Sequence, residues 1–235
     1  EECVNKFDIL NIFMGSETFT CDKKWVLSIC DEIIERGLKL NWYCNSRVDT
    51  IDRELAARMK KSGCFAVSLG VESGNQETLD KMKKGTSLLQ AEEAVQILKD
   101  HEIKTYLYYI IGFPWETKEM INDTINFAIK LDGDISDFYF AHPLYGTKLH
   151  HMAKENGILK HDKTYLYEYS FTSPYVSTEE LNELYRMALL RFYLRPKYLI
   201  KTLLSIRSPR VLYRITVMGF MKLFKLMRSK PNILK

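Results

Sequence analysis

The stretch FAVSLGVESG, residues 65–74, decides how this chain of 235 residues folds and where it acts. It begins as a short apolar strand and runs directly into a carboxylate, Glu72, which Ser73 and a glycine follow. A charged group at the end of a buried strand is costly to desolvate unless it meets a partner or a ligand. Ligands in α/β folds gather at the carboxyl ends of strands, so we expect a binding site at Glu72.

Strand and helix signals alternate on both sides of this stretch. The sequence predicts strands at residues 7–14, 40–45, 65–69, 105–111 and 135–141. It predicts helices between them at residues 23–36, 52–61, 76–82, 88–100 and 118–131. This alternation is typical of a parallel sheet with helical crossovers, either doubly wound or curled into a barrel. Polar, glycine or proline residues follow all of these strands, which favours a barrel with one active face. Because so few strands cannot close, we predict a partial (β/α) barrel.

The alternation stops near residue 157, which predicts two segments. Residues 1–157 would form the partial barrel, and residues 158–235 a loop with a C-terminal α-helical extension. Residues 190–235 hold 12 Lys and Arg and no Asp or Glu, so the rest of the chain is net acidic, with 22 basic against 30 acidic residues. Apolar and basic residues are mixed along this extension, which allows three interpretations. A helix packed on the barrel is favoured first and an interfacial membrane helix second, and nucleic-acid binding is the least favoured.

Composition limits the class of protein further. The chain is 46% hydrophobic and 27% charged, as in globular rather than disordered proteins. No apolar run reaches the roughly 18 residues that a membrane span needs. The 5 cysteines have no metal-ligand spacing, which predicts reduced cysteines in a cytoplasmic protein, peripheral to the membrane if the basic helix binds lipid. The chain begins with Glu1 rather than Met, so we expect a natural start further upstream.

Several short motifs occur along residues 1–157 in a particular order. They are GSE at 15–17, Arg47, GVESG at 70–74, GFPWET at 112–117 and PLYGT at 143–147. In type and order they resemble the radical S-adenosylmethionine (SAM) superfamily. The most similar branch is the group with the cobalamin-dependent radical SAM enzymes, the methylthiotransferases and the coproporphyrinogen dehydrogenases. The resemblance implies a radical SAM barrel whose first strand is missing from this chain.

The resemblance also implies which residues bind SAM. They are Gly15, Ser16, Glu17, Arg47, Glu72, Ser73, Lys84 and Gly112. Glu72 would bind the amino group or the ribose of SAM, and Lys84, twelve positions later, its carboxylate. The segment at 15–17 would make backbone contact with the methionyl amino group, and Arg47 could grip a carboxylate with two hydrogen bonds.

Each of these residues also has a structural interpretation. Glu72 and Arg47 could form a buried ion pair between neighbouring strand ends, and Lys84 could belong to a solvated helix face. Glu116 could simply begin the following helix. Tyr108, in a strand rich in tyrosine, is interpreted as strand packing rather than as a platform for a substrate.

One expected feature of the family is absent from the sequence. Radical SAM enzymes hold a [4Fe–4S] cluster with a CxxxCxxC loop, and this chain has none. The resemblance therefore implies the SAM-binding portion of an enzyme whose cluster ligands lie elsewhere. The enzyme would cleave SAM reductively to a 5′-deoxyadenosyl radical, with a flavodoxin- or ferredoxin-type reducing partner.

The substrate implied is a hydrophobic small molecule or a lipid-like precursor. Cobalamin in an N-terminal domain outside this chain would suit a methyltransferase or a related enzyme. The alternative is a degenerate barrel that binds a ligand or a partner without catalysis. An ordinary TIM-barrel enzyme is disfavoured, because the sequence offers no evident acid–base pair or nucleophile–histidine set.

Overall fold

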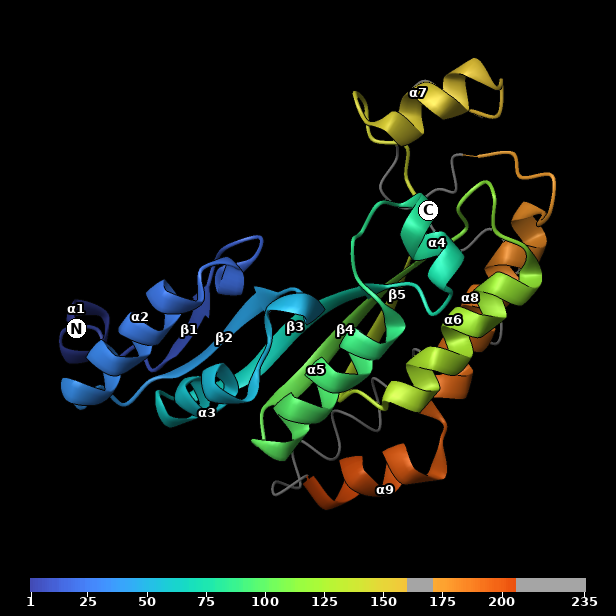
Figure 1. The fold of residues 1–235 in the computed structure, drawn as a ribbon. Helices are drawn as coiled ribbons and strands as arrows, with labels where there is room; N and C mark the ends of the chain where they lie inside the picture. The colour runs from blue at the N-terminus through green and yellow to red at the C-terminus, as the bar shows by residue number, and fades with distance from the viewer. Residues whose placement is uncertain (160–170, 206–235) are drawn as a thin grey trace. The chain divides into compact units, whose positions relative to one another are not determined.

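Strands β1 to β5 form one sheet in which their spatial order equals their order along the chain (Figure 1). The strands are β1 (Asn11–Met14), β2 (Asn41–Ser46), β3 (Cys64–Glu72), β4 (Lys104–Ile111) and β5 (Ile135–Phe140). Pairings β1–β2, β2–β3 and β3–β4 are parallel. A doubly wound sheet reverses its strand order at a switch point, whereas a barrel winds in one direction. The consecutive order therefore confirms the predicted α/β fold of the barrel type.

The predicted helices between the strands are confirmed to within one residue or so at their ends. They are α2 (Lys23–Glu35), α3 (Arg53–Lys61), α4 (Gln76–Lys81), α5 (Leu88–Asp100) and α6 (Lys118–Leu131). Side-chain caps fix several of their starts. Asp52 accepts the N–H of Leu55 at 2.9 Å before α3, and Ser87 forms a capping box with Gln90 before α5.

The remaining described elements are short or lie late in the chain. They are α1 (Glu2–Asn5), η1 (Phe19–Cys21), η2 (Val48–Thr50), α7 (Lys148–Glu155), α8 (Thr178–Tyr193) and α9 (Pro196–Ser205). This computed structural model describes residues 1–159 and 171–205. Residues 206–235 of the predicted basic C-terminal extension lie outside the described residues.

Two strands differ from their predicted extents. The first was predicted over residues 7–14 but covers only Asn11–Met14, because the one-turn α1 precedes it and Asp8 has a left-handed φ of 51°. The third is longer than predicted and runs through Gly70 to Glu72. Its register with β4 shifts between Gly70 and Glu72, which is a β-bulge. A bulge bends a strand locally and re-aims the side chain that follows it.

Contacts divide the structure into two compact units. One consists of Glu1–Tyr109 with Asn126–Tyr139, and the other of Ile110–Ile125 with Phe140–Lys235. The boundary between the units divides strand β4 after Tyr109 and strand β5 after Tyr139. The boundary predicted at residue 157 from the end of the strand–helix alternation stays a prediction.

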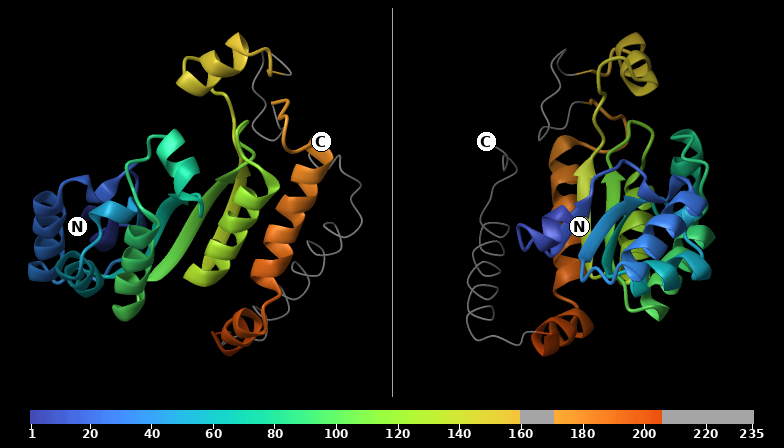
Figure 2. Two further views of the ribbon diagram at one scale, coloured as in Figure 1. Left: turned by 45° about the vertical axis from the view of Figure 1, so that its right-hand side comes forward. Right: turned by 90° about the vertical axis from the view of Figure 1, so that its left-hand side faces the viewer.

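The sheet of the first unit has two different faces. Helices α2, α3 and α5 lie on one side of the strands, as the right-hand view of Figure 2 shows. That side buries Trp42, Leu107 and Tyr109 completely. Strand residues alternate between faces, so Tyr43 and Tyr108 point to the other side, where both are half-buried. The second side is therefore the one that leaves room for a ligand.

Candidate functional site

Polar side chains enclose a hollow of about 280 Å³ at the carboxyl ends of β2 and β3. All of its lining residues belong to the first unit. They are Glu17, Thr18, Asn45, Ser46, Arg47, Ser68, Gly70, Glu72, Lys84 and Tyr108. The hollow thus brings together four of the residues predicted to bind SAM, namely Glu17, Arg47, Glu72 and Lys84.

Glu72 and Lys84 form an ion pair at the centre of this site. Lys84 Nζ lies 2.6 Å from Glu72 Oε1, and the two side chains are 17% and 16% exposed. Glu72 follows the bulge of β3 and has a left-handed φ of 68°, which is rare for a residue other than glycine. Lys83, directly before Lys84, is also left-handed, with a φ of 55°. Such strained backbone clusters at functional sites, because the surrounding structure must stabilise it. Lys84 is not part of a solvated helix face, and that interpretation was wrong.

Gly70 makes room for this ion pair. A Cβ atom at Gly70 would lie 2.5 Å from Glu72 Oε1 and 3.2 Å from Lys84 Nζ. The first distance is too short for a real contact, so any side chain at this position would displace the carboxylate. The glycine at the end of β3 therefore lets the charged pair lie close to the backbone without a shift of the Glu72 carboxylate.

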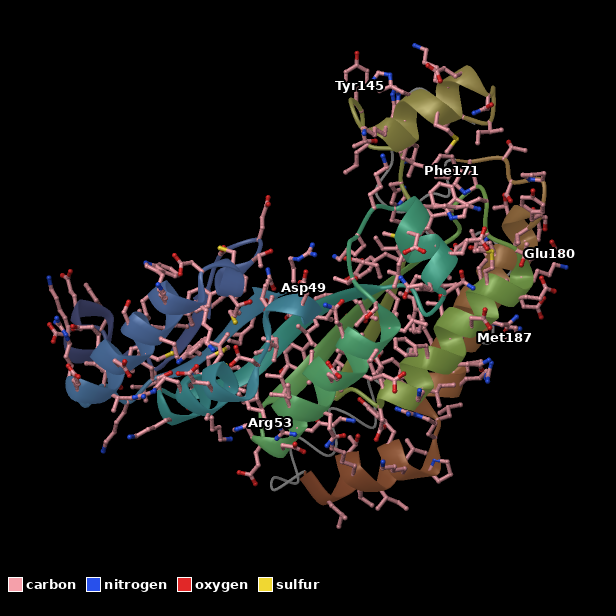
Figure 3. All side chains as sticks on the ribbon, in the orientation of Figure 1. Asp49, Arg53, Tyr145, Phe171, Glu180 and Met187 are labelled. Atoms are coloured by element: carbon pink, nitrogen blue, oxygen red, sulfur yellow. The ribbon has the colours of Figure 1, made fainter. Side chains whose placement is uncertain are left out.

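Arg47 pairs with Asp49 instead of Glu72, so the proposed Glu72–Arg47 ion pair was wrong. Its Nε and Nη2 donate to the two carboxylate oxygens of Asp49 at 2.9 and 2.8 Å. Figure 3 labels Asp49, which lies in η2 between β2 and α3. The hydrogen bond from Arg47 lowers the pKa of Asp49. The same hydrogen bond raises the pKa of Arg47, and the negative charge of Glu72 adds a smaller increase.

The segment at 15–17 forms part of the rim. Glu17 lines the hollow, and the carbonyl oxygen of Ser16 accepts a hydrogen bond from Asn45 Nδ2 at 3.3 Å. Gly15 stands outside the lining set, where a Cβ would meet only the ring of Phe13. The predicted contact of this segment with a methionyl amino group stays a prediction.

Three hydroxyl groups hydrogen bond to one another where η1 and η2 meet the end of β2. Thr20 Oγ1 hydrogen bonds to Thr50 Oγ1 at 2.6 Å and also to Ser46 Oγ. These three hydroxyls join η1, β2 and η2, which carry or flank the polar lining. The cluster therefore fixes the position of the rim rather than presenting a reactive group.

Two predicted site residues have structural contacts of their own. Ser73 is fully buried, and its Oγ accepts the backbone N–H of Asn75 at 3.1 Å. Gly112 belongs to the second unit, where its φ is 86° and its N–H donates to Glu116 Oε2 at 2.7 Å. The same oxygen accepts the N–H of Phe113 at 2.9 Å. That Ser73 and Gly112 bind a cofactor stays a prediction.

Glu116 does not begin the next helix, as the sequence had suggested. It is fully buried, and α6 starts two residues later at Lys118. Its carboxylate closes the loop after β4 by accepting two backbone N–H groups. This part of the GFPWET motif therefore stabilises a turn.

The sequence did not predict Asp49, which lies outside the lining but pairs with Arg47, or the lining residues Ser68 and Tyr108. Asp49 had one signal, since it stands two positions after Arg47, a spacing that permits a local bidentate pair. Ser68 and Tyr108 could have been found from the register, because they lie on the same face as Asn45 and Gly70 respectively. The interpretation of Tyr108 as strand packing alone was incomplete, because its side chain also lines the hollow.

The hollow suits SAM, whereas the described residues do not suit an iron–sulfur cluster. SAM carries an ammonium and a carboxylate, and the hollow presents a half-buried pair of opposite charges, Glu72 and Lys84. Within residues 1–159 and 171–205, no three His, Cys, Asp or Glu side chains gather closely enough to hold a metal ion. All cysteines of the chain occur before residue 65, and Cys30, Cys44 and Cys64 are buried. In the same described ranges no helix is long and apolar enough to cross a membrane.

Comparisons with known proteins show the family of this chain. Residues 1–128 match the radical SAM superfamily, and the chain belongs to that family. A protein of Pyrococcus horikoshii, described as an uncharacterized methyltransferase, is 36% identical over 201 residues, covering 83% of this chain and 43% of its own length. An anaerobic magnesium-protoporphyrin IX monomethyl ester cyclase of Cereibacter sphaeroides is 32% identical over 142 residues, covering 59% of this chain and 23% of the cyclase.

Solved structures show the same fold. The cobalamin-dependent SAM radical enzyme OxsB superposes with a TM-score of 0.71 and 14% identity, over 96% of this chain and 40% of OxsB. The radical SAM methyltransferase TsrM from Kitasatospora setae, with cobalamin and a [4Fe–4S] cluster bound, gives a TM-score of 0.59 and 19% identity, over 71% of this chain and 36% of TsrM. The chain thus spans less than half the length of each of these relatives.

Proposed function

We propose that this chain is the SAM-binding portion of a longer radical SAM enzyme. The observation that carries the proposal is the Glu72–Lys84 ion pair, 2.6 Å long, in a polar hollow at the carboxyl ends of the strands. Glu72 would accept the ammonium of SAM, and Lys84 would bind its carboxylate. Charged hydrogen bonds of this kind are the strong ones in a partly desolvated site, so both groups orient the amino acid end of the ligand.

The wider activity is part of the same proposal. A [4Fe–4S] cluster held outside the described residues would supply the electron that splits SAM, and a flavodoxin- or ferredoxin-type protein would reduce it. Cobalamin in a further domain is supported by the fold shared with OxsB and TsrM. Methyl transfer or ring chemistry on a hydrophobic small molecule is supported by the methyltransferase and cyclase names of the relatives.

Binding of SAM to the complete protein tests the proposal. Lys84→Met keeps the length of the side chain and removes the ammonium, so it should weaken SAM by about 10- to 150-fold, the equivalent of ~1.5–3 kcal/mol for a charged hydrogen bond. Formation of 5′-deoxyadenosine under reducing conditions then separates the enzyme from a barrel that binds without catalysis. Unchanged SAM affinity in Lys84→Met would remove the basis of the proposal.

A second proposal concerns the location of the protein: the cytoplasm, with contact to a membrane surface through the basic C-terminal region. The observation that favours it within the described residues is helix α9, whose apolar side chains are strongly exposed. Leu199, Ile200, Leu203 and Leu204 are 49%, 59%, 59% and 79% exposed. Lys197 and Lys201 lie on the same helix, and such a helix can bind anionic lipid.

Co-sedimentation with vesicles tests this contact. The protein should pellet with vesicles that contain phosphatidylserine and stay in solution with pure phosphatidylcholine. Replacement of Leu203 and Leu204 on α9 by Ser should abolish the effect, whereas Leu144→Ser, at an exposed leucine of the loop before α7, should leave it unchanged. Equal pelleting of all variants would contradict the contact.

A further inference from the structure

Asp49 holds the guanidinium of Arg47 in a fixed orientation. The two residues share a fork of parallel hydrogen bonds, from Nε to Oδ1 at 2.9 Å and from Nη2 to Oδ2 at 2.8 Å. Their side chains are 34% and 25% exposed, so water screens the pair only in part. The planar fork matches a single carboxylate. Since Asp49 already occupies it, the same fork cannot also grip the carboxylate of a ligand.

The same guanidinium also fixes the backbone at Lys84. Arg47 Nη2 donates to the carbonyl oxygen of Lys84 at 3.0 Å, across 37 positions of sequence. On the other side, the backbone N–H of Lys84 donates to the carbonyl oxygen of Leu79 at 3.1 Å. Both polar groups of the Lys84 backbone are therefore engaged.

The backbone on either side of Lys84 is unusual. Lys83 before it and Gly85 after it both have left-handed φ angles, of 55° and 71°. A residue such as Lys83 pays an energetic penalty in this conformation and keeps it only when the surroundings enforce it. The contact from Arg47 is one of those enforcing interactions.

We propose that Asp49 and Arg47 are positioning residues for Lys84, rather than ligands of SAM themselves. Asp49 orients Arg47, Arg47 holds the Lys84 carbonyl, and the lysine ammonium then reaches the point where it meets the carboxylate of the ligand. A lysine side chain is long and flexible. A fixed backbone at Lys84 therefore restricts the positions that its ammonium can reach. This inference rests on the proposed binding of SAM at Glu72 and Lys84.

Two ligands that differ only at the amino acid end test the inference. S-adenosylhomocysteine carries the ammonium and the carboxylate, and 5′-methylthioadenosine lacks both. In the complete protein, Asp49→Asn should weaken S-adenosylhomocysteine by about 5- to 30-fold, because Lys84 is less well placed. The affinity for 5′-methylthioadenosine should change by less than about twofold, since no contact of Lys84 is involved.

A double-mutant cycle with Lys84→Met provides the readout that a merely structural role would not move. If Asp49 acts through Lys84, Asp49→Asn should have little further effect once the lysine ammonium is gone. The matched control is Asp100→Asn, which removes the Asp partner of Arg53 (3.0 Å) in the same unit but away from the hollow. It should leave both affinities unchanged.

A second variant keeps the test informative if Asp49→Asn does not fold. Arg47→Lys keeps the charge but lacks the fork, so it should produce the same selective loss for S-adenosylhomocysteine. Equal losses for the two ligands, or losses that add to those of Lys84→Met, would overturn the positioning role. If the unaltered protein binds neither SAM nor S-adenosylhomocysteine, the proposed function itself fails. If it binds both but the variants show equal or additive losses, only the positioning role fails.

Discussion

Two glutamates follow a glycine near the end of a strand, and they differ in what they contact. Glu72, in the first unit, is paired with the side chain of Lys84 beside a hollow. Glu116, in the second unit, is fully buried and accepts the backbone N–H groups of Gly112 and Phe113. A lysine side chain can swing away and release its partner, whereas a backbone N–H in a turn cannot. A carboxylate is therefore available to a ligand only when its partner can move.

The largest effect should come from the loop carboxylate. Glu116→Ala removes the acceptor of two buried N–H groups, and each unsatisfied group costs about 1–3 kcal/mol, so we expect a loss of roughly 3 kcal/mol of unfolding free energy. Urea unfolding of the variant measures it. The exposed Glu179→Ala, on the first turn of α8, is the control and should change little. Unaltered stability in Glu116→Ala would show that this loop carboxylate is not structural.

Glu72→Ala should give the opposite pattern. It should weaken SAM by about 10- to 150-fold, equivalent to ~1.5–3 kcal/mol, while the unfolding midpoint stays close to that of the unaltered protein. Calorimetric titration and urea unfolding of the same preparation measure both quantities. If the affinity is unchanged and the stability falls, Glu72 is a structural residue like Glu116 and the comparison fails.

A smaller effect should follow from crowding the charged pair without removing it. Gly70→Ala places a Cβ 2.5 Å from Glu72 Oε1, so the carboxylate must shift. Small-to-large changes in packed sites typically cost about 1–3 kcal/mol, and we expect SAM affinity to fall about tenfold. Gly37→Ala is a control, because a Cβ there meets nothing within 4 Å, although its φ of 61° adds some strain. Equal SAM affinity in the two variants would contradict the close approach at Gly70.

Asp49 offers the smallest effect and the finest distinction. The hydrogen bond from Arg47 lowers its pKa in the folded protein. A carboxylate of this kind contributes stability above its unfolded pKa of about 3.9 and loses it as the pH falls through the lower folded value. The difference in thermal midpoint between the protein and Asp49→Asn should therefore stay constant from about pH 7 to pH 5 and shrink only in stronger acid. A difference that already disappears near pH 6 would contradict the Arg47 pairing.

The strands and helices of the barrel could be predicted because local signals agree with the fold. Asp52 and Ser87 stand where caps are needed, and the strand at 105–111 alternates between buried and half-buried residues as its sequence suggests. The start of β1 could not be predicted in this way. Residues 7–10 are as apolar as a strand. The chain turns at Asp8 instead, where the backbone N–H of Asp8 donates to the carbonyl oxygen of Val4 in α1 at 3.2 Å.

Four of the eight residues predicted to bind SAM line the hollow, and that they bind it stays a prediction; their pairings were not predicted. The resemblance to radical SAM enzymes implied Lys84 as a partner residue of the site, and the structure places its ammonium 2.6 Å from the Glu72 carboxylate. The spacing of Asp49 from Arg47 permits a local pair, but spacing alone does not decide between Asp49 and Glu72 as the partner of Arg47. Geometry decides between them, since the β-bulge before Glu72 and the short helix η2 set where each carboxylate lies.

The Glu72–Lys84 pair has a net charge of zero before any ligand arrives. The amino acid end of S-adenosylhomocysteine is also neutral as a whole, since it is a zwitterion. Binding then exchanges one ion pair for two without changing the total charge, so few small ions are released or taken up, and affinity should be nearly independent of salt. A molecule with only one of the two charges would leave either the glutamate or the lysine without its counter-charge. The hollow already carries the electrostatic pattern of an α-amino acid, and under the proposed function it would select ligands that carry the same pattern in reverse.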